Sequence, residues 1–164
     1  MSALSLSELR GMGRRSDVVV LGIGNRLRGD DAAGVLVAEE CMRRGMAGVD
    51  CGDVPENHLA DVARREPRVV ILADAADFGG RPGDAAVFEA DQLGGSGVAT
   101  HGMPISLIAD HLAALCGARV LLLAVQPKAL GFGLALSPEV AAAAARAADV
   151  LAGLTPPARV EVTS

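Results

Sequence analysis

Apolar residues along this chain alternate between short continuous runs and longer stretches with helical spacing. The runs are rich in Val, Ile and Leu, as in strands buried on both faces of a parallel sheet. They predict five strands, at residues 17–22, 49–54, 68–73, 84–89 and 119–125. The spaced stretches predict helices, at residues 32–44, 56–66, 104–115 and 138–154. This alternation indicates an α/β protein, a three-layer α/β/α sandwich with helices on both faces of one sheet.

The fourth strand is expected to run against its neighbours. About ten residues separate it from the third strand, whereas a parallel crossover needs about a dozen or more. The sheet should therefore be mixed. Residues 93–100, which follow this strand, are glycine-rich and polar, and we expect a mobile surface loop there.

The length and the apolar content favour one domain. The chain has 164 residues, of which 51% are apolar, enough for a single substantial core. We assign that domain to residues 17–155, with a polar N-terminal extension at residues 1–16 and a C-terminal tail at residues 156–164. Ser137, with Pro138 behind it, is expected to cap the last helix.

The charge and the aromatic content exclude several classes of partner. The net charge is -5 without a basic stripe, and the chain has three Phe, no Tyr and no Trp, so we expect no nucleic-acid partner and no membrane. The longest apolar run is too short to cross a bilayer, and no export signal is visible. The three cysteines are widely spaced, which favours reduced thiols and a cytoplasmic location.

Residues 22–31 follow the first strand but do not form a nucleotide site. The loop GIGNRLRGDD lacks the third glycine of a dinucleotide-binding fingerprint and the lysine of a P-loop. Its two aspartates would repel a phosphate. The loop therefore predicts another kind of chemistry.

Three side chains at strand ends could share one site. Of Asp30 and Asp31, we expect one to cap the following helix and the other to be available for a ligand. Asp74 ends the buried third strand, where a charge needs a partner, and His101 stands at the entrance of a helix; for both, a structural role stays open. If the first and third strands are neighbours, Asp31, Asp74 and His101 converge as two oxygen ligands and one imidazole. Such a set suits nickel, zinc or manganese and leaves positions for water or substrate.

Five motifs, in order along the chain, resemble those of the hydrogenase maturation endopeptidases. They are GIGNRLRGDDAAG at 22–34, PEN at 55–57, ADAADFG at 73–79, THGMP at 100–104 and QP at 126–127. The resemblance covers residues 18–154 and points in particular to the type that processes the nickel-iron hydrogenase of formate hydrogenlyase. It implies a sheet of order 2-1-3-5-4 with an antiparallel fourth strand.

The resemblance also implies the function. Such an endopeptidase removes a C-terminal extension from the precursor of a nickel-iron hydrogenase large subunit after nickel has been inserted. Asp31, Asp74 and His101 match the family's metal ligands. The nickel is then supplied by the substrate, with no organic cofactor, and the precursor is the partner of an enzyme that we expect to be a cytoplasmic monomer.

The reaction chemistry and two other functions stay open at this point. The sequence holds no G-x-S-x-G motif and no cysteine beside a histidine, so covalent catalysis has little support. Metal-assisted attack on the scissile carbonyl and an aspartate general base are both compatible with the residues. The alternative functions are a peptidase or amidohydrolase with a resident zinc, and a nickel-binding protein without catalysis, for which three histidines are few.

Overall fold

The computed structural model describes residues 4–95, 97–100 and 104–154. Within these ranges the strands are β1 (Val18–Gly22), β2 (Ala47–Asp50), β3 (Val69–Asp77), β4 (Ala85–Glu89), β5 (Ala99–Thr100) and β6 (Arg119–Val125). The α-helices are α1 (Ala33–Arg43), α2 (Leu59–Arg64), α3 (Ile105–Cys116) and α4 (Pro138–Ala152). Short 3-10 helices are η1 (Leu6–Gly11), η2 (Arg15–Asp17), η3 (Asp30–Ala32), η4 (Pro55–His58) and η5 (Ala90–Gln92). No helix in the described part of the chain is both long and apolar enough to cross a membrane.

The main sheet has the strand order β2-β1-β3-β6-β4, in which β6 is the fifth predicted strand. Strands β2, β1, β3 and β6 are parallel, and β4 is antiparallel to β6. The order implied by the resemblance and the direction inferred for the fourth strand are both confirmed. In the register of β1 with β3, Gly22 lies beside Ala73, so the carboxyl end of β1 lies next to the residue that precedes Asp74.

Strand β3 is longer than predicted, and its extra length pairs with a strand that the composition did not predict. It continues to Asp77, where Ala99 and Thr100 pair with it in antiparallel fashion. The end of residues 93–100 is therefore a short strand, and the expectation of a loop throughout was wrong there. Two residues are too few to produce a recognisable alternation of apolar and polar positions.

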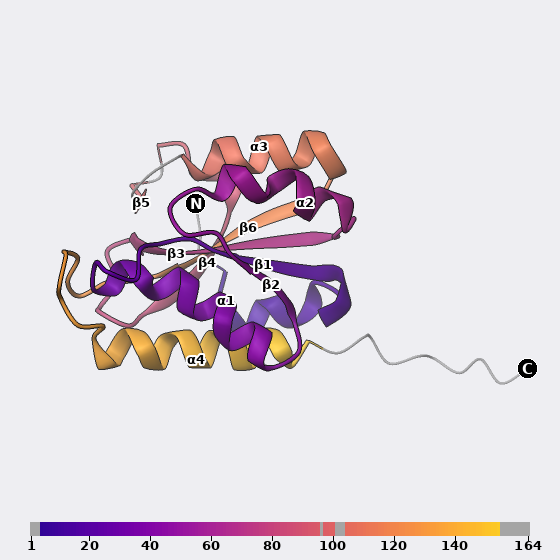
Figure 1. The fold of residues 1–164 in the computed structure, drawn as a ribbon. Coiled ribbons are helices and arrows are strands. Elements are labelled where there is room, and N and C mark those ends of the chain that lie inside the picture. Colours follow the sequence, from indigo (N-terminus) through magenta and orange to yellow (C-terminus); the bar gives the residue numbers. More distant parts are fainter. Residues whose placement is uncertain (1–3, 96, 101–103, 155–164) are drawn as a thin grey trace, which may run out of the picture.

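Helices cover both faces of the sheet (Figure 1). Helices α2 and α3 pack on one face, and α1 and α4 pack on the other. The loops after β1 and β6 lie at the same end of the sheet, on the left in Figure 1. This is the end at which ligands bind in open α/β sheets.

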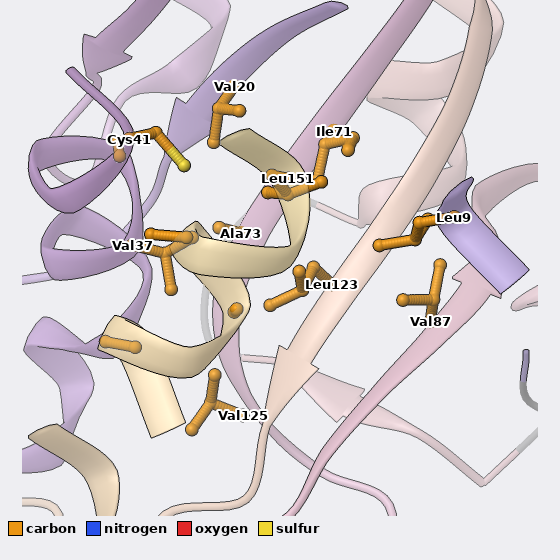
Figure 2. Packing of buried hydrophobic residues seen from close by; sticks show 14 of the residues in the cluster. Leu9, Val20, Val37, Cys41, Ile71, Ala73, Val87, Leu123, Val125 and Leu151 are labelled. Carbon is orange, nitrogen blue, oxygen red and sulfur yellow. The ribbon is translucent and has the colours of Figure 1, made fainter. Parts of the chain in front are cut away.

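Each face of the sheet has its own apolar core. Figure 2 shows the core under α1 and α4, where Val37 and Leu151 of the helices lie over Ile71 and Leu123 of the strands. The fully buried strand residues explain why the sequence shows continuous apolar runs instead of alternation.

Residues 4–16 pack against the domain despite their polar composition. Leu4 forms an antiparallel bridge with Val87 of β4, with nitrogen-to-oxygen distances of 2.7 and 3.1 Å. Leu9 of η1 is fully buried and belongs to the core under α4. This segment therefore covers the outer edge of β4.

Candidate active site

Asp74 lies near the carboxyl end of β3, almost completely buried, with 2% of its surface exposed. Its Oδ2 atom finds no hydrogen-bond donor among the described residues. Burial raises the pKa of the Asp74 carboxyl well above its ordinary value, and the negative charge of Asp31 raises the pKa further. The Ala75 backbone N–H donates to the carboxyl and acts in the opposite direction. A buried carboxyl oxygen without a donor is rare in folded proteins and needs an explanation.

Asp31 lies in η3, just after the loop that leaves β1, and is 7% exposed. The Asn25 backbone N–H donates to Asp31 Oδ2 at 3.0 Å. Gly22, at the end of β1, pairs with Ala73, and Gly34, three residues after Asp31, packs on the Ala73 carbonyl oxygen, so the structure brings Asp31 and Asp74 together. His101 lies outside the described residues. Within those described, no group of three or more His, Cys, Asp or Glu side chains is arranged to hold a metal ion.

Two glycines allow η3 and α1 to approach the strand ends this closely. A Cβ atom on Gly34 would lie 2.0 Å from the carbonyl oxygen of Ala73, the residue before Asp74. A Cβ atom on Gly24, whose φ is +146°, would lie 1.9 Å from the backbone oxygen of Asp31. No side chain fits either position, so the glycines of the first motif set the distance between the two aspartates.

Asp30 does not cap the helix that follows it, as one of the two adjacent aspartates was expected to do. Neither η3 nor α1 has a side-chain hydrogen bond at its N-cap. Asp30 is instead fully buried and reaches the loop between β6 and α4. Its carboxylate accepts the backbone N–H groups of Lys128, Ala129 and Ser137 at 2.9, 3.1 and 2.8 Å, and the Ser137 hydroxyl at 2.9 Å.

These bonds make Asp30 the anion at the N-terminus of α4. Ser137 occupies the N-cap position, as predicted, but its hydroxyl donates to Asp30 and makes no cap bond within its own helix. Burial alone raises the pKa of Asp30, but the donated hydrogen bonds outweigh it and lower the pKa below its ordinary value. The positive end of the helix dipole favours the same charge. Asp30 therefore ties the loop after β1 to the loop after β6.

Sequence reasoning missed a third carboxylate close to the pair. The charge of Asp53, in the loop after β2, contributes to the raised pKa of Asp74. The Asn25 side chain donates to Asp53 Oδ2 at 3.4 Å. The predicted second strand, at residues 49–54, would include Asp53, whereas β2 is Ala47–Asp50, so its position after a parallel strand was not recognised.

Gln126, of the QP motif, holds the loop after β3. Its side-chain oxygen accepts the backbone N–H groups of Phe78 and Gly80, both at 3.0 Å. Its amide donates to Asp77 at 3.2 Å. The motif residue therefore ties the loop after β6 to the end of β3 and the loop that follows it.

The described cysteines offer no nucleophile to this site. Burial raises the pKa of the Cys41 thiol and of the Cys51 thiol to about 12. Both are therefore protonated at neutral pH, and a thiol is a poor nucleophile. Cys116 ends α3, three residues before β6 begins at Arg119, and so lies at the opposite end of the sheet.

Comparisons with known proteins agree with this fold. A family model described as hydrogenase maturation protease matches residues 35–153. Hydrogenase 3 maturation protease of Escherichia coli K12 is 33% identical over 118 residues, covering 70% of this chain and 75% of that protein.

Solved structures of such proteases have the same fold. A [NiFe] hydrogenase maturation protease HycI from Thermococcus kodakarensis matches with a TM-score of 0.80 and 31% identity, covering 90% of this chain and 97% of that one. The endopeptidase HycI from Escherichia coli matches with a TM-score of 0.70 and 27% identity, covering 85% of this chain and 95% of that one. The family model spans most of the sequence, and the chain therefore belongs to the hydrogenase maturation proteases.

Proposed function

We propose that this protease removes the C-terminal extension of a nickel-loaded large-subunit precursor of a nickel-iron hydrogenase. The observation that carries the proposal is the buried Oδ2 atom of Asp74, which lacks a donor among the described residues while a second carboxylate, Asp31, lies close by. A cation between these groups would satisfy the free oxygen and remove the repulsion between the two charges. Nickel carried by the precursor is such a cation.

Asp31 and Asp74 supply oxygen ligands to that nickel, and His101 is proposed as the third ligand. The Asn25 N–H holds one oxygen of Asp31, which orients the other. Two hard ligands and one imidazole suit a borderline divalent ion. Nickel held beside the scissile bond polarises the carbonyl or activates the attacking water; the competing route uses one of the aspartates as general base.

One chain carries both aspartates, so a monomer is sufficient for the reaction. The three cysteines of the chain are free, two of them in the core, which favours a reducing compartment. We therefore assign the reaction to a monomer in the cytoplasm.

The test is intact-mass spectrometry of a precursor incubated with the protein, with and without nickel. We expect loss of a C-terminal peptide only when nickel is present, and retention of the full mass with Asp31→Asn or Asp74→Asn. Cleavage of a nickel-free precursor would refute the role of substrate-borne metal. Stoichiometric zinc in the purified protein, measured by elemental analysis, would favour a resident-metal hydrolase instead.

The Asp31→Ala, His101→Ala double variant lacks two of the three proposed ligands, so retained cleavage would refute the metal route and the route with Asp31 as general base. Far-UV circular dichroism of the same variant shows whether it is folded. A folded, active double variant would place the chemistry elsewhere.

A further inference from the structure

Three exposed apolar side chains gather on the two loops that border the site. Leu27, in the loop after β1, is 69% exposed, and Phe132, in the loop after β6, is 70% exposed. Leu134 is half exposed in the same loop. With Arg28 these residues form what we call the apolar rim. Isolated exposed apolar residues are ordinary, but a group of them on adjoining loops marks an interaction surface.

Backbone hydrogen bonds join the two loops and fix the rim in place. The Gly133 N–H donates to the Leu27 carbonyl at 3.0 Å, and the Gly131 N–H donates to the Arg28 carbonyl at 3.3 Å. Gly29 and Leu130 form an antiparallel bridge. The buried Asp30 carboxylate binds the start of the second loop, as described above. The rim is thus a preorganised surface, which lowers the entropic penalty of binding a partner.

Arg28 gives the rim a positive charge that no acidic side chain among the described residues neutralises. Its guanidinium carbon lies 4.8 Å from the centre of the Phe132 ring, a cation–π contact. Arg28 forms no ion pair with the described residues, whereas Arg26 pairs with Glu39 and Asp50. A partner that covers the rim therefore needs apolar groups and a carboxylate.

We propose that the apolar rim is the docking surface for the large-subunit precursor, and that it takes an apolar segment carrying a carboxylate that faces Arg28. This rests on the proposed function. Leu27 lies four residues before Asp31, and its loop leads directly into η3, where Asp31 lies, so the rim borders the place proposed for the scissile bond.

The test separates docking from chemistry by steady-state cleavage of nickel-loaded precursor, followed by intact mass. We expect Leu27→Ser, Phe132→Ser and Arg28→Glu each to raise KM about tenfold or more, as for residues at the centre of an interface, with kcat within about twofold of wild type. Arg28→Lys keeps the charge and should lie nearer to wild type. Control variants are Met42→Ser, near the end of α1, and Leu115→Ser, near the end of α3; both side chains are exposed but lie at the other end of the sheet. We expect both controls to match wild type.

Each other outcome overturns the inference in a recognisable way. Rim variants that match wild type in KM, or that lose kcat at unchanged KM, refute docking while the protease function stands. If light scattering shows a wild-type dimer that Phe132→Ser disperses, at unchanged KM, the rim is an interface between two copies of this chain. A wild-type protein that neither cleaves nor binds any nickel-loaded precursor, measured by cleavage and by calorimetric titration, refutes the proposed function and the docking together.

Discussion

Asp30 and Asp74 are two buried aspartates for which the same substitution should have opposite effects on stability. Asp30 accepts hydrogen bonds from three backbone N–H groups and one hydroxyl, whereas Asp74 Oδ2 accepts none from the described residues. Asp30→Asn should therefore lower the free energy of unfolding. Asp74→Asn should raise it at neutral pH, because it removes a charge that burial and Asp31 disfavour.

The size of the Asp30→Asn effect follows from the donors that face the side chain. If the new NH₂ group replaces Oδ1, the Ser137 N–H loses its acceptor; if it replaces Oδ2, the N–H groups of Lys128 and Ala129 lose theirs. The less damaging orientation leaves one buried donor unsatisfied, which costs about 1–3 kcal/mol. The two backbone hydrogen bonds that remain, from Lys128 and Ala129, lose a charged acceptor, about 0.5–1 kcal/mol each. The total is about 2–5 kcal/mol, a large part of the roughly 5–15 kcal/mol that stabilises an ordinary domain.

The pH dependence gives a second, independent signature. The pKa of Asp30 is lowered in the folded protein, so its contribution is complete above the pKa of the unfolded chain, near 3.9, and is lost as pH falls through the folded value. The free energy of unfolding of wild type should therefore fall more steeply than that of Asp30→Asn below about pH 4. For Asp74, whose folded pKa is raised, the stabilisation by Asp74→Asn should grow as pH rises from about 4 towards neutral.

The assay is urea unfolding followed by far-UV circular dichroism, since the chain has no Trp and no Tyr to report by fluorescence. Asp84→Asn is the matched control, because Asp84 is exposed and accepts one backbone N–H, that of Arg81; we expect little change. An Asp30→Asn protein within about 0.5 kcal/mol of wild type would refute the donor argument. A loss of stability in Asp74→Asn equal to that in Asp30→Asn would refute the distinction between the two aspartates.

Three further predictions concern packing and thiol chemistry. Gly34→Ala should lower the free energy of unfolding by about 3 kcal/mol or more, because the added Cβ meets a backbone oxygen; Gly94→Ala, which has open space, is the control in the same urea series, and equal stability of the two would contradict this packing. Leu9→Ala should lower the free energy of unfolding by about 2–5 kcal/mol, because Leu9 is fully buried, whereas Leu27→Ala, at an exposed position, should change it little; a similar value for both would mean that η1 is not docked in solution. Iodoacetamide at pH 8 should modify Cys116 in the native protein and reach Cys41 and Cys51 only in urea, because burial raises the pKa of both to about 12; native labelling of all three, seen by mass spectrometry, would contradict this.

The sheet could be predicted from the sequence because its determinants are local. Continuous apolar runs mark buried strands, and the short connection before β4 decides its direction. Asp30 shows where local reasoning ends: an aspartate before a helix is usually a cap, but its donor Ser137 is 107 residues away. Leu9 was missed for a similar reason, since one apolar side chain in a polar segment gives no periodic pattern. The convergence of Asp31 and Asp74 followed from strand order, whereas the position of His101 stays a prediction.

The bridge between Leu4 and Val87 bears on how this protein avoids aggregation. Strand β4 forms one border of the sheet, and an exposed border strand can recruit a strand from another molecule. Leu4 occupies the backbone groups of Val87 with two hydrogen bonds. The opposite border, β2, is only four residues long and ends in a charged residue, Asp50, which also discourages such pairing. Removing residues 4–16 would expose the backbone groups of Val87 in β4, so we expect the shortened chain to associate through this border more readily.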